Sequence, residues 1–129
     1  MIFYMTKEDG KFVTVKIGNA TVKAEVADTV LKQMKGLMFR KSLPEDEGMW
    51  FDFKTDGYPS IWMPNMSFPI DIVWVNSDFE VVHIEKNAQP CIIPCKIYRT
   101  EEKARYVFEV NAKFTDLNGI EIGTKVKLT

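Results

Sequence analysis

The sequence predicts a single mostly-β domain, barrel-like or α+β, built as a compact barrel or sandwich of short strands with one or two short helices. Its 129 residues are 46% hydrophobic and 27% charged, which is typical of one globular domain over residues 1–129. Short segments that alternate apolar and polar residues recur along the chain between turn signals. Helical spacing of apolar residues is clear in one short stretch, so strands dominate the prediction.

The N-terminal third predicts a β-hairpin followed by a helix. Residues 11–26 alternate apolar and polar side chains on both sides of a Gly-Asn turn. Residues 28–36 have apolar side chains at helical spacing, and Asp28 or Thr29 can cap the first turn. Gly36 suits the C-terminal end of this helix.

The rest of the chain is dominated by strand signals. Residues 70–75 are apolar on both faces, which favours a central strand covered on both sides. The remaining elements are expected at 49–53, 71–76, 79–85 and 105–111 as strands, at 112–119 as a helical turn, and at 120–122 and 125–128 as the last short strands.

Asp71 begins the segment that we expect to be buried. A buried carboxylate is costly unless a charge or several hydrogen-bond donors meet it. Three arginines could pair with it, Arg40, Arg99 and Arg105. We predict a pair between Arg40 and Asp71, either as a structural ion pair or as a charge pair that orients a polar ligand.

The loop that precedes Asp71 holds Trp62, Met63 and Asn65 among prolines. Proline cannot donate to a central ladder, so residues 64–69 are not expected to form a central strand. An exposed tryptophan beside an amide could bind a small polar ligand such as a sugar or nucleoside. Alternatively, Trp62 and Met63 plug the barrel while Asn65 caps backbone groups.

Glu109 lies on a predicted strand face with Val107 and Asn111. It could act as a general acid beside Asp71, which would indicate glycosidase-like chemistry. The favoured interpretation makes it a rim residue that is hydrogen-bonded at the sheet edge, with Arg105 as its partner.

Two sets of soft side chains could hold a metal. His83, Cys91 and Cys95 could form an open zinc site, although a local disulfide or a free thiol pair is the preferred interpretation. Thioethers could bind copper(I), although methionine more often fills irregular gaps in a core. The methionines concerned are Met34, Met38, Met49, Met63 and Met66. We therefore predict no cofactor, with the His83 set as the alternative.

Charge and hydropathy restrict the location and the partners. The net charge is −1 without blocks of like charge, so no nucleic-acid or membrane-surface partner is expected. The first ten residues lack the pattern of a secretory signal, which favours a cytoplasmic location. Lysine greatly outnumbers arginine and glutamine is scarce, as in proteins of heat-adapted organisms.

Three blocks, "VADTVLKQMKGLMFRKSLPEDEGMWFDF", "IWMPNMSFPIDIVWVNSDFEVVHI" and "YVFEVNAKFTDLNGIEIGTKV", resemble the signature blocks of the domain of unknown function 192 family. They come in the family's order and cover roughly residues 11–128. The resemblance implies a compact β-barrel-like fold with a small helix. The family occurs in bacteria and archaea, some members are secreted, and it has no established activity.

The family pattern matches this sequence at positions in all three blocks. The matching positions are Gly36, Leu37, Met38, Arg40, Gly48, Met49, Trp62, Met63, Asn65, Pro69, Asp71 and Glu109. The chain departs from the pattern at Pro64, where lysine is common, at Lys113, where glycine is frequent, and at Thr124, where aspartate is common.

Together these observations predict a shallow pocket near the ends of strands 49–53, 70–76 and 105–111. Its expected lining is Arg40, Met49, Trp62, Asn65, Asp71 and Glu109. The expected function is the binding of a small polar ligand, a carbohydrate among the candidates, without catalysis. The alternatives are a hydrolase that uses Asp71 and Glu109 or a metal at His83, Cys91 and Cys95, and a structural or partner-binding domain.

Overall fold

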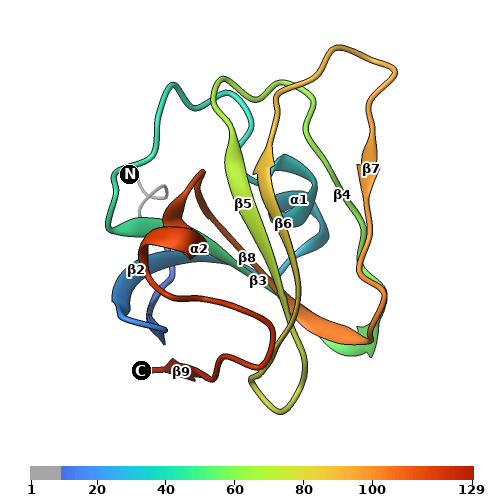
Figure 1. The fold of residues 1–129 in the computed structure, drawn as a ribbon. Helices are drawn as coiled ribbons and strands as arrows, with labels where there is room; N and C mark the ends of the chain where they lie inside the picture. Colours follow the sequence, from blue (N-terminus) through green and yellow to red (C-terminus); the bar gives the residue numbers. More distant parts are fainter. Residues whose placement is uncertain (1–9) are drawn as a thin grey trace, which may run out of the picture.

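The computed structural model describes residues 10–129, so nine of the ten residues behind the signal-peptide prediction lie outside the described part. Strands make up most of the regular structure, with two short helices between them (Figure 1). The elements are β1 (Phe12–Ile17), β2 (Ala20–Ala27), α1 (Val30–Lys35), β3 (Glu47–Gly57), β4 (Ile61–Trp62), β5 (Ile70–Val75), β6 (Val81–Ala88), β7 (Ile97–Tyr98), β8 (Ala104–Asn111), α2 (Phe114–Leu117) and β9 (Val126–Leu128).

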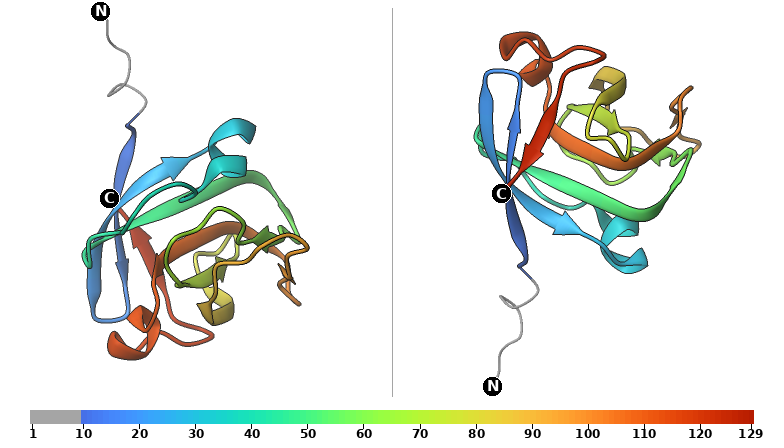
Figure 2. Two further views of the ribbon diagram at one scale, coloured as in Figure 1. Left: turned by 90° about the horizontal axis from the view of Figure 1, so that it is seen from above. Right: turned by 90° about the horizontal axis from the view of Figure 1, so that it is seen from below.

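Seven of the strands form one sheet in the order β6-β5-β8-β3-β2-β1-β9. Figure 2, in which the molecule is seen from above and from below, shows that this sheet is strongly curled. All its neighbours pair antiparallel except β2 and β3, which pair parallel and are joined through α1. β8 lies between β3 and β5, so the centre of the sheet joins strands that are far apart in the sequence.

The two faces of the curled sheet carry two separate apolar clusters. One contains Trp50, Val73 and Phe108 and is closed by Phe114 of α2. The other contains Phe51, Ile72 and Trp74 and packs against side chains of β4 and β7. Neighbouring residues of one strand belong to opposite clusters, as the two-residue period of a strand requires. The position of a polar residue along one of these strands therefore determines which face of the sheet its side chain lies on.

Most of the predicted elements are confirmed. β1 and β2 form the expected hairpin, and every residue of β5 is buried, as expected for a strand covered on both faces. Residues 120–122 do not form the predicted strand. Ile120 is buried in the core instead, and residues 120–124 form a turn. The Gly123 N–H of this turn donates to the carbonyl of Val81 in β6. The two-residue strands β4 and β7, which pair with each other, were not predicted.

Two backbone positions explain features of the family pattern. A Cβ atom at Gly48 would lie 2.7 Å from the main-chain oxygen of Glu109, so only glycine permits this close approach of β3 to β8. Lys113 has a φ of 77°, in the left-handed region that favours glycine. Lys113 therefore adopts a backbone conformation that a glycine at this position would adopt without strain.

Between residues 10 and 129, no helix combines the length and the hydropathy needed to span a bilayer.

Candidate functional site

A pocket of about 280 Å³ lies between α1 and β4, over the face of the sheet that carries Phe51. α1 and the residues that follow it form one wall, and β4 with the loop after it forms the opposite wall. Phe51 and Phe53 of β3 and Glu109 of β8 complete the lining. Of the predicted site residues, this pocket brings together Trp62 and Glu109.

Polar contacts rather than a buried apolar face hold α1 beside the pocket. The Thr29 hydroxyl accepts from the Lys32 N–H at 3.2 Å and caps the helix. The Gln33 amide donates to the carbonyls of Ala27 at 3.1 Å and Asp52 at 2.8 Å, which ties α1 to β2 and β3. No residue of α1 is buried.

The apolar side chains of α1 therefore remain available at the surface. Val30, Leu31 and Met34 are 65% to 79% exposed, although their helical spacing resembles that of a core-facing helix. Val30 and Met34 line the pocket. Helical periodicity thus located this helix correctly, but its apolar face borders a pocket instead of filling the core.

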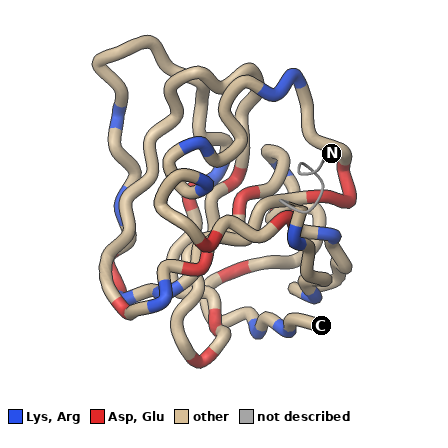
Figure 3. Tube along the Cα trace, turned by 180° about the vertical axis from the view of Figure 1, so that it is seen from behind, with Lys and Arg blue, Asp and Glu red and all other residues tan. Residues whose placement is uncertain are grey.

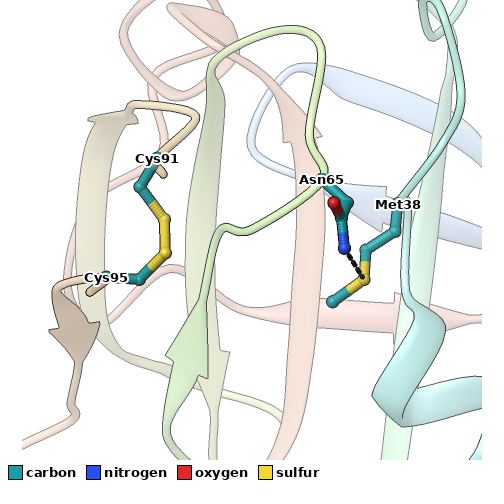
Figure 4. Close-up of a disulfide and its surroundings, with 4 residues drawn as sticks. All are labelled: Met38, Asn65, Cys91 and Cys95. Atoms are coloured by element: carbon teal, nitrogen blue, oxygen red, sulfur yellow. Dashed lines mark hydrogen bonds between the residues drawn. A yellow bond between two sulfur atoms is a disulfide. The ribbon is translucent and has the colours of Figure 1, made fainter. Parts of the chain in front are cut away.

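The loop with Trp62 and Asn65 forms the opposite rim. Trp62 is 50% exposed and lines the pocket. Asn65 has a φ of 58°, its carbonyl accepts from the Phe39 N–H at 2.9 Å, and its amide lies 3.9 Å from the sulfur of Met38 (Figure 4). Asn65 thus connects the two walls, and the interpretation that Trp62 plugs the barrel is wrong.

The methionines divide between the core and the pocket. Met49 and Met63 are almost fully buried, as expected of core gap-fillers. Met34, Met38 and Met66 are partly or largely exposed and line the pocket, and the buried Met63 also borders it. Flexible thioether side chains let such a surface adapt to ligands of different shape.

Glu109 forms part of the pocket floor, contrary to the prediction that it is a rim residue paired with Arg105. It is 4% exposed and lies opposite Met49 of β3 and Ile72 of β5 in the middle of the sheet. A Cβ atom at Gly36 would lie 3.8 Å from its Oε1, so the end of α1 covers the carboxyl closely. Arg105 contacts Asp52 instead, at 4.0 Å.

The Glu109 carboxyl has no hydrogen-bond partner among residues 10–129. Burial raises its pKa to about 8, and the positive charge of Arg40 opposes part of this shift. The group is therefore mostly protonated at neutral pH and can donate one hydrogen bond to a molecule in the pocket.

Asp71 lies on the other face of the sheet, because Asp71 pairs with Val110 whereas Glu109 pairs with Ile72. Its carboxylate accepts from the N–H groups of Asn87 at 2.9 Å, Lys113 at 3.3 Å and Thr115 at 2.9 Å, and from the Thr115 hydroxyl at 2.6 Å. These donors satisfy the buried carboxylate and fix α2 to β5. Asp71 does not reach the pocket.

The predicted Arg40–Asp71 pair is wrong. The Arg40 guanidinium bonds to Oε1 of Glu25 at 2.7 Å, and both side chains are partly exposed. A buried carboxylate in a chain with few arginines does not have to take an arginine partner. Backbone N–H groups that converge from distant segments supply the donors instead, and a sequence does not reveal them.

Both predicted catalytic arrangements are also excluded by the geometry. Asp71 and Glu109 lie on opposite faces of the sheet and cannot act on one bond, so they are not a hydrolase pair.

Cys91 and Cys95 form a disulfide, in agreement with the preferred interpretation (Figure 4). Their sulfurs are not available to a metal, and His83 packs on the ring of Trp74. The His83, Cys91 and Cys95 zinc set is therefore wrong.

A second hollow of similar volume lies beside α2 and includes Asp46, Asn111 and Leu117. The Asn111 amide donates to the carbonyls of Leu43 and Pro44, so its donors already have partners. No predicted site residue lines it. The pocket with Glu109 is the better candidate site because it is lined by a largely buried carboxyl that has no hydrogen-bond partner in the described part of the chain.

Comparisons with known proteins agree with the resemblance of the sequence blocks. The model of the family DUF192, "Uncharacterized ACR", matches residues 13–128. A solved structure from Sinorhizobium meliloti 1021, provisionally described as a transcription regulator, is similar with a TM-score of 0.87 and 27% identity, over 93% of this chain and 95% of that chain. A protein of unknown function from Novosphingobium aromaticivorans DSM 12444 is similar with a TM-score of 0.80 and 33% identity, over 90% and 83% of the two chains. No curated protein matches significantly.

Proposed function

This chain belongs to the DUF192 family, and we propose that it is a binding module for a small ligand with a polar group. The observation that carries the proposal is Glu109, a residue only 4% exposed whose carboxyl lines an open pocket and has no hydrogen-bond partner among residues 10–129. Buried polar groups are nearly always hydrogen-bonded, because an unpaired one costs the fold free energy. A ligand that bonds to this carboxyl would complete the site.

The walls of the pocket support a ligand that is partly apolar. Met34, Met38 and Met66 offer polarisable contacts, and the half-exposed ring of Trp62 offers a flat surface. Concave sites with mainly apolar walls and a single fixed polar group are typical of small-molecule sites. A carbohydrate would use Trp62 as its stacking surface and Glu109 as its hydrogen-bond partner.

Charge supports a small molecule in preference to nucleic acid. The net charge is −1, and acidic and basic residues are interspersed along the chain trace (Figure 3). Proteins that bind nucleic acid present a basic patch to the phosphates. The description of the Sinorhizobium meliloti protein as a regulator therefore does not lead us to propose DNA contacts for this chain.

A thermal-shift screen tests the proposal with the wild-type protein, Trp62→Ala, Asn65→Ala and the control Phe12→Ala. Phe12 is also 50% exposed but lies on β1, outside the pocket. A ligand at 100 times its Kd stabilises the folded state by about 2.7 kcal/mol, a Tm increase of several degrees.

We expect at least one sugar, nucleoside, amine or amino acid to raise the Tm of the wild type and of Phe12→Ala but not of Trp62→Ala. Asn65→Ala should weaken the effect, because Asn65 holds the two walls together. Equal shifts in all four proteins, or no shift with any compound, would contradict the proposal.

A further inference from the structure

We propose that the ligand of this pocket is an organic monocation, an amine with an apolar body, whose ammonium group pairs with the carboxylate of Glu109. The inference rests on the proposed function and names its ligand class. Glu109 is more than nine-tenths buried, lines the pocket and has no partner among residues 10–129. A buried carboxylate becomes favourable only when a cation or several donors meet it, and a bound ammonium group supplies both.

Within residues 10–129, no positively charged side chain forms an ion pair with the Glu109 carboxyl. The guanidinium of Arg40 acts on Glu109 from a distance, while its short hydrogen bond is with Glu25 of β2. On the neighbouring strands, Met49 and Ile72 lie directly opposite Glu109, and Glu47 is the nearest titratable residue on the same face of β3.

Lys35 of α1 also lines the pocket, but it is an exposed residue. Its positive charge disfavours a second cation on the ligand, and for this reason a monocation fits better than a diamine. The positive charge of the ligand is needed only at the floor, where Glu109 lies.

The remaining lining suits the rest of such a molecule. The ring of Trp62 can contact a cation or a methylene chain through its face. The methionine side chains can adapt to an aliphatic or an aromatic body. A neutral polar ligand would accept a hydrogen bond from the protonated carboxyl but would not form an ion pair with the carboxylate.

Binding includes a proton transfer that can be measured. Glu109 is protonated in the free protein at neutral pH, so pairing with an ammonium group requires its O–H bond to break and the proton to pass to solvent. The ammonium group keeps its own three protons. One bound amine therefore releases about one proton at pH 7 and almost none well above pH 8.

The experiment compares three probes of similar shape by isothermal titration calorimetry, namely 2-phenylethylamine, 2-phenylethanol and 3-phenylpropionate. Each is titrated into the wild type, Glu109→Gln and the control Glu121→Gln, an exposed position outside the pocket. For the wild type, titrations at pH 7 in buffers of different ionisation enthalpy also count the protons that are released on binding. This measurement remains valid if Glu109→Gln does not fold.

We expect the amine to bind most tightly, with release of about one proton at pH 7 and with about tenfold higher affinity at pH 9 than at pH 7. Glu109→Gln should lose the preference for the amine, and Glu121→Gln should keep it. If the alcohol binds as well as the amine and no proton is released, the ligand class is wrong while the proposed pocket stands. If no probe binds, the inference is overturned, and the screen with Trp62→Ala decides the proposed function separately.

Discussion

Replacing Glu109 by glutamine should change how the stability of the protein depends on pH. The pKa of Glu109 is about 8 in the folded protein, against an ordinary value of 4.5. Between these values the folded state binds more protons than the unfolded state, so the free energy of unfolding falls as the pH rises. Above pH 8 the free-energy cost of burying the charged carboxylate therefore opposes folding, and below pH 4.5 this cost is absent.

The size of the effect follows from the width of this window. It spans about 3.5 pH units, and each unit corresponds to about 1.4 kcal/mol. Between pH 5 and pH 8.5 the wild type should therefore lose about 3 to 5 kcal/mol relative to Glu109→Gln, in which the group does not titrate. That is a large part of the 5 to 15 kcal/mol by which domains are usually stable.

Urea unfolding at pH 5.0, 6.5 and 8.5 measures this difference for the wild type, Glu109→Gln and Glu121→Gln. Apart from the one carboxyl that each variant replaces, the three proteins have the same titrating groups, so the contributions of these groups cancel in the comparison. We expect Glu109→Gln to be much more stable than the wild type at pH 8.5 and similar to it at pH 5.0. Parallel curves for the wild type and Glu109→Gln over the whole range would refute our account of Glu109.

Four further variants test the roles of other residues by urea unfolding at pH 7. Asp71→Asn should destabilise by about 3 kcal/mol, because its amide would face backbone donors; a loss below 1 kcal/mol would contradict the four hydrogen bonds. Arg40→Ala should cost at most about 1 kcal/mol, since its pair with Glu25 is partly exposed, and a much larger loss would indicate another partner. Replacing Cys91 and Cys95 together by serine should cost about 2 kcal/mol or less for so short a loop, and no effect of reductant on the wild type would argue against the disulfide. Gly48→Ala should cost more than 2 kcal/mol, and tolerance would show that β3 and β8 can separate.

Much of the fold could be predicted because periodicity is a local property. The alternation in residues 11–26 and the apolar run at 70–75 determine which faces must be buried, and both were correct. The parallel pairing of β2 with β3 and the pairing of β4 with β7 depend on distant segments. The two-residue strands are also too short to produce a periodic signal.

The candidate site was harder to predict because burial of a polar residue depends on neighbours in space. Trp62, Glu109 and Asp71 were expected to line one pocket; Trp62 and Glu109 line the pocket beside α1, whereas Asp71 lies on the other face of the sheet. The pairing register, which places Glu109 opposite Ile72, was not available from the sequence. The sequence contained little signal for the depth of Glu109, because its own strand face also carries Arg105 and Asn111, and only the opposite face, with Phe108 and Val110, is apolar.

The position of β8 in the sheet has a consequence for how the chain acquires its structure during synthesis. β8 joins β3 to β5, yet it is made after both of them. Until residues 104–111 have been made, β3 and β5 each present an unpaired edge, and such edges can associate with other chains. Pairing between distant segments is also slow, because long loops must close first. The nascent chain should therefore depend on chaperones until β8 is inserted, and variants that delay this insertion should aggregate even if the completed fold tolerates them.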